Sequence, residues 1–242
     1  MKVPNSFHNH GSLAIFELIF TLKLLSGASG CLVFALVDND MKDNLKRESR
    51  EVTKALIESL QSDDANKTYI ALCDGNGEWN GKNFLEKGWF TIDRPVKDEN
   101  GNFVDATTDL CFVAGMTLPP VKIDNTEVSE GRHVSLVLAR PKTGKYHQIR
   151  QHLASGRIGH AILGDSSHGR SRTNRIWKKR RHLMKERTCL HLVRLELPPT
   201  DFTPNGIQCT CPLSEDLKIM FDEMPELMEM AKPKLLIEGV TI

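Results

Sequence analysis

The stretch from 140 to 153 has residue types and spacing suited to binding an anion. It reads Arg140-Pro141-Lys142-Thr143-Gly144-Lys145-Tyr146-His147-Gln148-Ile149-Arg150-Gln151-His152-Leu153. A strand is expected to end before Gly144, which permits a tight turn. A helix is expected from Tyr146 to Ser155, stopped by Gly156. The N–H groups exposed at such a helix start suit an anion such as phosphate.

Polar and apolar side chains separate on this expected helix. Its polar face combines residues at i, i+3, i+4 and i+7, namely His147, Arg150, Gln151 and Ala154. Ile149 and Leu153 share the face expected to contact the core. An arginine beside two hydrogen-bonding side chains can bind a nucleotide, and the competing interpretation is a helix side that only faces solvent. A nucleoside-triphosphate loop is excluded, because that pattern requires glycine at Ala139 and serine or threonine at Tyr146.

A dense group of basic residues lies between positions 170 and 187, opposed there only by Glu186. It comprises Arg170, Arg172, Arg175, Lys178, Lys179, Arg180, Arg181, Lys185 and Arg187. The formal net charge of the chain is only +1, so a nucleic-acid interaction would have to rest on such local clustering. Basic runs of this density often contact phosphate, and they also occur on solvated helices and loops.

The cysteines are scattered through apolar, strand-like runs, at Cys31, Cys73, Cys111, Cys189, Cys209 and Cys211. This placement favours reduced, buried thiols in an intracellular protein over a disulfide framework. Cys189, His191, Cys209 and Cys211 could be imagined as zinc ligands. Their spacing matches no common zinc pattern, and strand placement explains it more simply. We therefore predict no metal site.

The N-terminal part is apolar but interrupted. The run 13–25 carries Glu17 and Lys23, and only Lys2 supplies a positive charge before it. A signal peptide would need a cationic start and an unbroken apolar run. A membrane span would have to hold both charges and cross the small-residue stretch 26–30. We predict a soluble chain whose first segment packs on the core as a helix or a strand.

The elements that must position these residues are mostly strands. Alternating or apolar runs predict strands over 28–36, 68–73, 87–92, 110–114, 134–138 and 190–197. Helices are expected over 40–60, capped by Asn39 or Asp40, and after Ser214. Because turns are hairpin-like and helices do not alternate regularly with strands, we predict an α+β fold. Its sheet should be mixed and mostly antiparallel, with flanking helices, in a single domain.

The motifs also resemble a known family. Residues 143–150 resemble the TGRxHQIR signature of RluA-type RNA pseudouridine synthases. Residues 160–169 resemble that family's H-P-I-x-G-D-x-x-H-G segment, 67–72 its K-x-Y-x-A motif, and 29–36 the strand after its catalytic loop. The stretch 170–175 is most similar to the tRNA pseudouridine synthase C branch. This resemblance implies a pseudouridine synthase-like domain at 22–242, preceded by a divergent segment at 1–21.

The resemblance implies that uridine in tRNA or rRNA is isomerised to pseudouridine without a cofactor or metal, in a cytoplasmic or organellar monomer. The base must leave its stack to be reached. By resemblance, Arg150 pairs with the catalytic aspartate and keeps it ionised, and Tyr69 stacks on the flipped base. The residues expected to contact RNA are Lys23, Lys145, His147, Gln148, Arg170, Arg172 and Arg175.

The chain departs from the family in the catalytic loop. The family pattern H-R-L-D-x-x-T/A-S-G corresponds here to residues 22–30, and its aspartate position is Leu25. Leucine has no lone pair, so it cannot be a nucleophile or a base. Either the protein has lost the chemistry and kept RNA binding, or residues 1–24 are a misassembled or truncated start. Because similarity is lost across the whole segment, the second explanation is favoured.

A structural prediction follows for Arg150. If Leu25 takes the place of the aspartate, the arginine has lost its expected ion-pair partner. A buried guanidinium without an acceptor is strongly unfavourable. We therefore predict that Arg150 is partly exposed, or bonded to another carboxylate or a backbone carbonyl.

Overall fold

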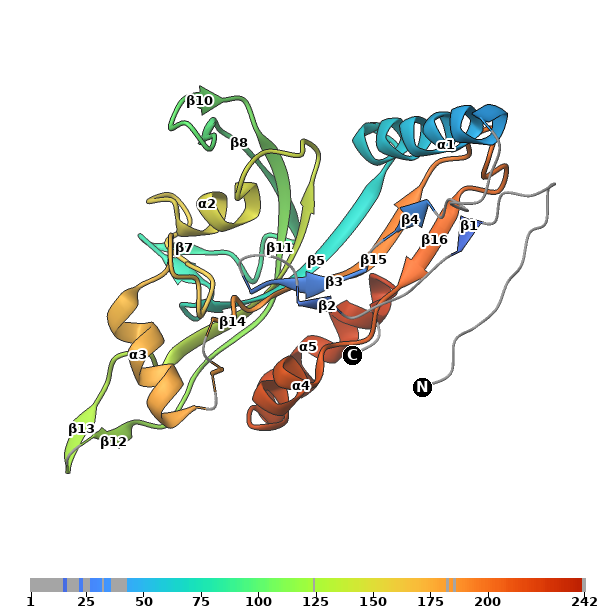
Figure 1. The fold of residues 1–242 in the computed structure, drawn as a ribbon. Coiled ribbons are helices and arrows are strands. Elements are labelled where there is room, and N and C mark those ends of the chain that lie inside the picture. The colour runs from blue at the N-terminus through green and yellow to red at the C-terminus, as the bar shows by residue number, and fades with distance from the viewer. Residues whose placement is uncertain are drawn as a thin grey trace.

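The computed structural model describes residues 15–16, 22–23, 27–31, 33–35, 43–123, 125–181, 183–184 and 186–240 (Figure 1). The helices are α1 (Asp43–Gln61), α2 (Gln148–Ala154), α3 (Ser171–Arg180), α4 (Glu215–Asp222) and α5 (Pro225–Ile237). The strands are β1 (Ile15–Phe16), β2 (Leu22–Lys23), β3 (Ser29–Gly30), β4 (Phe34–Ala35), β5 (Asn66–Asp74), β6 (Glu78–Trp79), β7 (Lys82–Asn83), β8 (Trp89–Asp93), β9 (Val96–Lys97), β10 (Phe103–Val104), β11 (Thr107–Thr117), β12 (Val121–Ile123), β13 (Thr126–Val128), β14 (His133–Pro141), β15 (Leu190–Leu197) and β16 (Ile207–Thr210).

One large sheet organises the fold. Within the described ranges it has eight strands, in the order β2-β3-β15-β5-β14-β11-β8, with β16 also paired to β15. Strand β3 runs parallel to β15, and the other pairings in this sheet are antiparallel. The hairpins β6–β7, β9–β10 and β12–β13 are separate two-stranded sheets. The prediction of an α+β fold with a mixed, mostly antiparallel sheet is confirmed.

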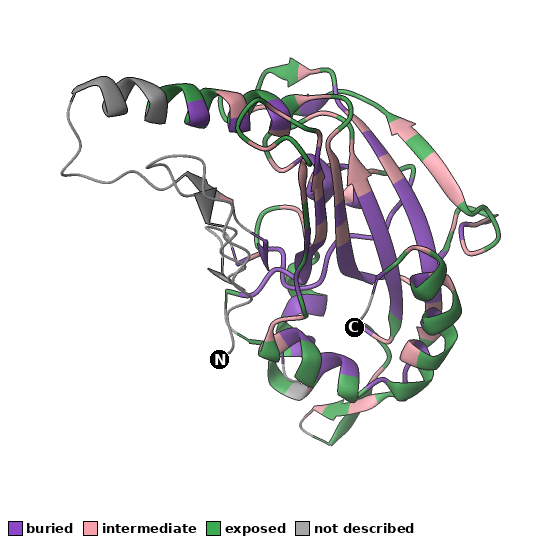
Figure 2. Ribbon diagram, turned by 90° about the vertical axis from the view of Figure 1, so that its right-hand side faces the viewer, coloured by how far each residue is buried: buried purple, intermediate pink, exposed green. Residues whose placement is uncertain are grey.

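The core lies on both faces of this sheet. Residues 110–114 of β11 are all buried, although neighbouring side chains of a strand point to opposite faces. The central strands are therefore covered on both sides, as the continuous buried colour in Figure 2 shows. Helix α5 contacts β11 and β14, and α2 contacts the same two strands. Helix α1 lies at one end of the molecule, and α3 lies with the β12–β13 hairpin at the other (Figure 1).

Several expected boundaries shift for local reasons. The helix expected from Tyr146 begins at Gln148. His147 has a left-handed φ of 49°, which is outside the right-handed helical range, so it cannot be part of the helix. The helix after Ser214 is divided into α4 and α5, and the second begins at Pro225. The strand expected over 28–36 is present as the short β3 and β4. The proposed cap at Asn39 or Asp40 lies outside the described residues, as does most of the first segment.

The prediction of buried thiols is confirmed, because all six cysteines are buried and none forms a disulfide. In the described ranges, no group of three or more histidine, cysteine, aspartate or glutamate side chains could hold a metal ion. Among the helices that the structure describes, none is both long and apolar enough to span a bilayer.

Candidate active site

A buried ion pair lies at the centre of the turn and helix that the sequence singled out. Arg150, only 5% exposed, reaches from α2 to Asp165, which is 1% exposed. Its Nε and Nη2 donate to the two carboxylate oxygens, each at 2.7 Å. This two-bond geometry is the strongest form of an arginine–carboxylate contact. The prediction for Arg150 is confirmed in its second form, with Asp165 as the other carboxylate.

The chain around Asp165 holds this carboxylate in place. Oδ1 also accepts the backbone N–H groups of Ser167 and His168, at 2.8 and 2.9 Å. Burial alone would raise the pKa of Asp165, but the hydrogen bonds from Arg150, His168 and Ser167 outweigh it and lower the pKa. Asn174 of α3 adds a bond from Nδ2 to the Asp165 carbonyl. Asp165 is therefore a fixed anion at neutral pH.

Two histidines extend the pair toward the surface. Nη1 of Arg150 lies 2.7 Å from Nε2 of His147, whose Nδ1 lies 3.3 Å from Nε2 of His168. Because a guanidinium only donates, Nε2 of His147 must accept, and its proton is on Nδ1. Burial, followed by the charges of Arg150 and His168, lowers the pKa of His147, and burial also lowers that of His168. Arg150 therefore donates to neutral His147, and Nδ1–H of His147 donates to Nε2 of His168.

Gln148 has a different place from the one expected. We predicted that it contacts RNA, but its side chain is buried and its amide is bonded within the protein. Oε1 accepts from Thr143 Oγ1 and Lys145 N, and Nε2 donates to Thr107 O and Thr108 Oγ1. The prediction of an RNA contact is corrected here. Gln148 is the first residue of α2, and its side chain hydrogen-bonds back to the turn before the helix. Gln148 positions the turn, and Lys145 remains exposed on it.

Tyr69 lies in the middle strand of the sheet. Its Cα is opposite Ala139 of β14 on one side and Leu192 of β15 on the other. The ring is partly buried and packs against both hydrophobic clusters of the protein. Burial, followed by the nearby Cys31, raises the pKa of Tyr69 to about 12. The phenol is therefore neutral at physiological pH and presents an aromatic surface, not a charge.

The described end of the segment that resembles the family's catalytic loop lies against residues 186–188. Gly27, two positions after Leu25, has a φ of 79° and accepts the N–H of Thr188 at 3.1 Å. A side chain at Gly27 would collide with the carbonyl of Glu186, and one at Gly164 with the carbonyl of Arg187. The segments 27–29 and 163–165 thus both pack against 186–189. Leu25 and the side chain of Lys23 lie outside what the structure describes.

Arg187 does not belong to the basic surface to which the sequence assigned it. It is 1% exposed, and its Nη1 and Nη2 donate to Gly27 O and Ser29 Oγ at 2.9 and 2.8 Å. Its Nε lies 3.3 Å from Oδ2 of Asp216 at the start of α4. Ser29 Oγ is also 2.7 Å from Nδ1 of the buried His191. Because it is buried, Arg187 is not available to contact phosphate, and it joins the segment 27–29 to the start of α4.

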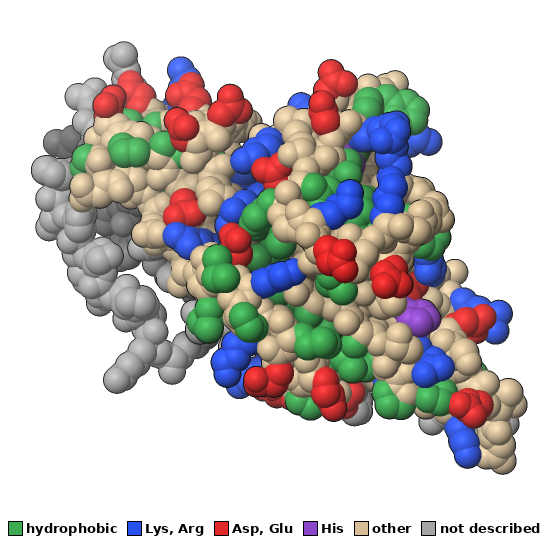
Figure 3. Space-filling view, turned by 180° about the vertical axis from the view of Figure 1, so that it is seen from behind, with side chains coloured by type: hydrophobic (Ala, Val, Ile, Leu, Met, Phe, Trp, Pro, Cys, Tyr) green, Lys and Arg blue, Asp and Glu red, His purple; other side chains and the backbone are tan. Residues whose placement is uncertain are grey.

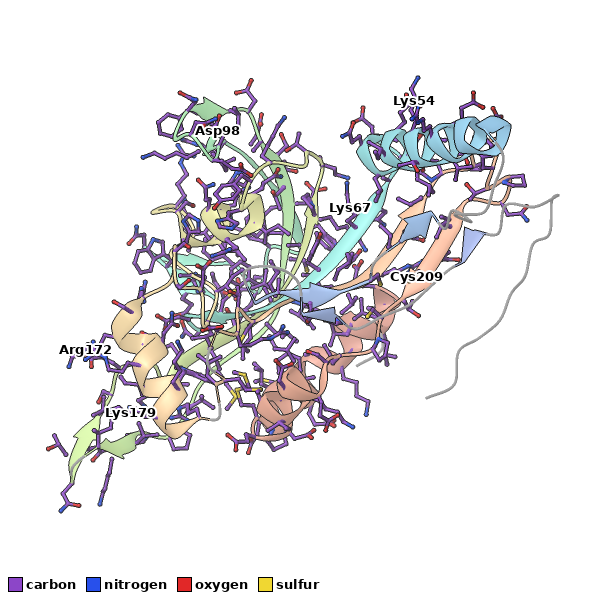
Figure 4. All side chains as sticks on the ribbon, in the orientation of Figure 1. Lys54, Lys67, Asp98, Arg172, Lys179 and Cys209 are labelled. Atoms are coloured by element: carbon purple, nitrogen blue, oxygen red, sulfur yellow. The ribbon has the colours of Figure 1, made fainter. Side chains whose placement is uncertain are left out.

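The other described members of the basic group, from Arg170 to Arg181, are on or next to α3. Arg172, Arg175, Lys178 and Lys179 are exposed, and Figure 4 labels Arg172 and Lys179 on this helix. Arg172 pairs with Glu130 at 2.8 Å, and Arg170 pairs with Asp74 at 3.1 Å. The structure therefore brings Lys145, His147 and Arg150 together, and it places the α3 arginines on a neighbouring surface. Sequence reasoning missed Asp165 as the partner of Arg150, although Asp165 lies in a motif already noted.

Two buried histidines predict that the protein loses stability in acid. Nε2 of His160 accepts the N–H of Gly77 at 3.0 Å, which requires an unprotonated nitrogen. Burial lowers the pKa of His160 and of His152 below the ordinary 6.5. Above pH 6.5 both rings are neutral in the folded and unfolded chain, and their contribution is fully present. As the pH falls from there through the lowered pKa values, the unfolded chain takes up protons first and the free energy of unfolding decreases.

Thermal melting between about pH 8 and about pH 5 measures this effect. We expect the melting temperature to fall on acidification, and the fall to be smaller in His160→Gln, which cannot take up that proton. A melting temperature independent of pH over this range would contradict the assignment.

The family model and the similar proteins point to the same family. Residues 26–155 match the family described as RNA pseudouridylate synthase. A tRNA pseudouridine synthase C of Yersinia pestis is 30% identical over 196 residues, covering 75% of this chain and 69% of the relative. That of Vibrio cholerae is 28% identical over 179 residues, covering 69% of this chain and 61% of the relative. The match thus spans less than two thirds of the length of the Vibrio protein.

A solved structure shares the fold. The human protein RNA Pseudouridylate Synthase Domain Containing 1 superimposes with a TM-score of 0.52 at 19% sequence identity. The superposition covers 88% of this chain and 86% of the human chain. The two proteins therefore share the overall fold.

Proposed function

The chain belongs to the RNA pseudouridylate synthase family, and on this premise we propose that it binds tRNA or rRNA through a scaffold built to isomerise uridine to pseudouridine. The observation that carries the proposal is Arg150, buried and oriented within the signature turn and helix. A monomeric state and a cytoplasmic location are parts of the same proposal.

The chemistry sets out what the site must supply. Uridine loses its N-glycosidic bond, the base turns, and a carbon of the base joins the same ribose. A carboxylate is required as nucleophile or base, and an arginine beside it keeps it ionised. Arg150 is available for this, because the guanidinium has more N–H groups than its bonds to Asp165 and His147 use. The α3 arginines would contact phosphates, and the ring of Tyr69 would stack on the base.

One observation favours a second function, RNA binding without isomerisation. Position 25, which the family resemblance assigns to the carboxylate, is a leucine in this chain. Its hydrocarbon side chain cannot attack a ribose or accept a proton. The RNA-contacting side chains do not depend on it.

Pseudouridine formation on unmodified bulk tRNA and rRNA tests whether the scaffold can isomerise uridine and whether Leu25 alone prevents it. The protein, Leu25→Asp and the matched control Leu25→Asn are assayed in parallel. We expect only Leu25→Asp to form pseudouridine, because asparagine has the size of aspartate without its charge. Pseudouridine formed by the unchanged protein would mean that another acid is the nucleophile. If Leu25→Asp binds RNA and remains inert, the binding function is the better account.

A further inference from the structure

Two aromatic rings are exposed on neighbouring segments beside the site. Tyr146, on the turn before α2, is 43% exposed, and Phe103, in β10, is 71% exposed. Exposed lysines accompany them, Lys145 next to Tyr146 and Lys97 opposite Phe103 in the β9–β10 hairpin. Figure 3 shows hydrophobic and basic side chains next to one another at this end of the molecule. Exposed aromatic rings offer apolar surface on which a base can stack.

The side chain of Gln151 hydrogen-bonds both to the β9–β10 hairpin and to the turn before α2. Oε1 of Gln151 accepts the backbone N–H of Lys97 at 2.9 Å. Its Nε2 donates to the carbonyls of Lys97 and Tyr146, at 2.8 and 2.9 Å. The hairpin is therefore fixed relative to the turn. At its tip, Oδ1 of Asp98, labelled in Figure 4, accepts the N–H groups of Asn100 and Asn102, so this carboxylate is engaged within the hairpin.

The ring of Tyr146 is held in one orientation. It stacks on His147 with ring centroids 3.8 Å apart and planes 24° apart. His147 is itself fixed by its bond to Arg150. On the hairpin, Nζ of Lys97 lies 5.6 Å from the centroid of the Phe103 ring. The Tyr146 ring is thus held against His147, and a lysine lies beside the Phe103 ring.

We propose that Tyr146, Phe103, Lys97 and Lys145 form a binding surface for single-stranded RNA, which holds nucleotides flanking the target uridine. This inference rests on the proposed function. Bases stack on exposed aromatic rings whatever their sequence, and lysines beside the rings neutralise the phosphates that connect them. Single rings separated by charged side chains suit bases that are presented one at a time. A folded protein partner would instead need a continuous apolar area.

Fluorescence anisotropy with a short, uridine-containing single-stranded RNA tests the surface. We expect Tyr146→Ala and Phe103→Ala each to weaken binding by about fivefold or more, in line with the loss of one stacked base. Tyr146→Phe and Phe103→Tyr should bind as the unchanged protein does. Phe202→Ala is the matched control, because Phe202 is 37% exposed in a turn with no part in this surface. Melting temperatures verify that the variants are folded.

The outcomes distinguish this inference from the function on which it rests. If the unchanged protein binds the RNA and both alanine variants bind equally well, the inference is overturned and the proposed function stands. An equal loss of affinity for double-stranded RNA would also overturn it, because stacking requires unpaired bases. If the unchanged protein binds bulk tRNA or rRNA but not the single-stranded RNA, the inference is overturned; if it binds none of them, the proposed function itself fails.

Discussion

Asp165→Ala is expected to lower the free energy of unfolding by about 3–5 kcal/mol, the usual loss when one member of a buried ion pair is removed. The side chains of Arg150 and Asp165 are 6% and 0% exposed, so water cannot replace the lost carboxylate. The N–H groups of Ser167 and His168 would lose their acceptor as well. Urea unfolding followed by circular dichroism measures the change.

A matched exposed pair provides the control. Arg172 and Glu130 lie 2.8 Å apart, but their side chains are 74% and 48% exposed. Glu130→Ala should therefore change the free energy of unfolding by less than about 1 kcal/mol. Arg150→Met combined with Asp165→Ala should lose less than the two single changes together, because each removes the other's unpaired charge. A loss below about 1 kcal/mol in Asp165→Ala would show that the pair is not buried in solution.

The second large effect is expected at Arg187. Arg187→Met keeps the length of the side chain and removes its hydrogen bonds to Gly27 and Ser29 and its ion pair with Asp216. We expect a loss of about 3 kcal/mol, at the lower end for buried pairs, since the side chain of Asp216 is 19% exposed. Hydrogen exchange should also become faster at residues 27–31. This local response distinguishes loss of the connection to the loop from general destabilisation.

Arg175→Met is the control for charge and size, because Arg175 is exposed on α3. It should leave the free energy of unfolding and the exchange at 27–31 unchanged, while weakening RNA binding. If Arg187→Met also left the free energy of unfolding and the exchange at 27–31 unchanged and weakened RNA binding, Arg187 would be a phosphate contact and not a structural residue.

The amino-acid sequence determined the fold class and pointed to the turn and helix of the candidate site. Strand periodicity identified β5, β14 and β15, because a strand with buried neighbours needs apolar side chains at regular positions. The helix α1 followed from the spacing of Val52 and Leu56, which are both buried. The motif at 143–150 located the turn and helix that hold Arg150. Each of these features depends on residues close together in the chain, so local patterns were sufficient.

Tertiary structure alone decided which polar groups meet. Arg150 and Asp165 are fifteen positions apart and Arg187 and Ser29 are 158 apart. Arg187 and Arg175 belong to the same basic run, yet one is buried and the other exposed. Sequence composition cannot separate them, because burial of a charge depends on whether the fold brings an acceptor to it. Gln148 shows the same limit, since its amide was assigned to RNA and is bonded to residues forty positions away.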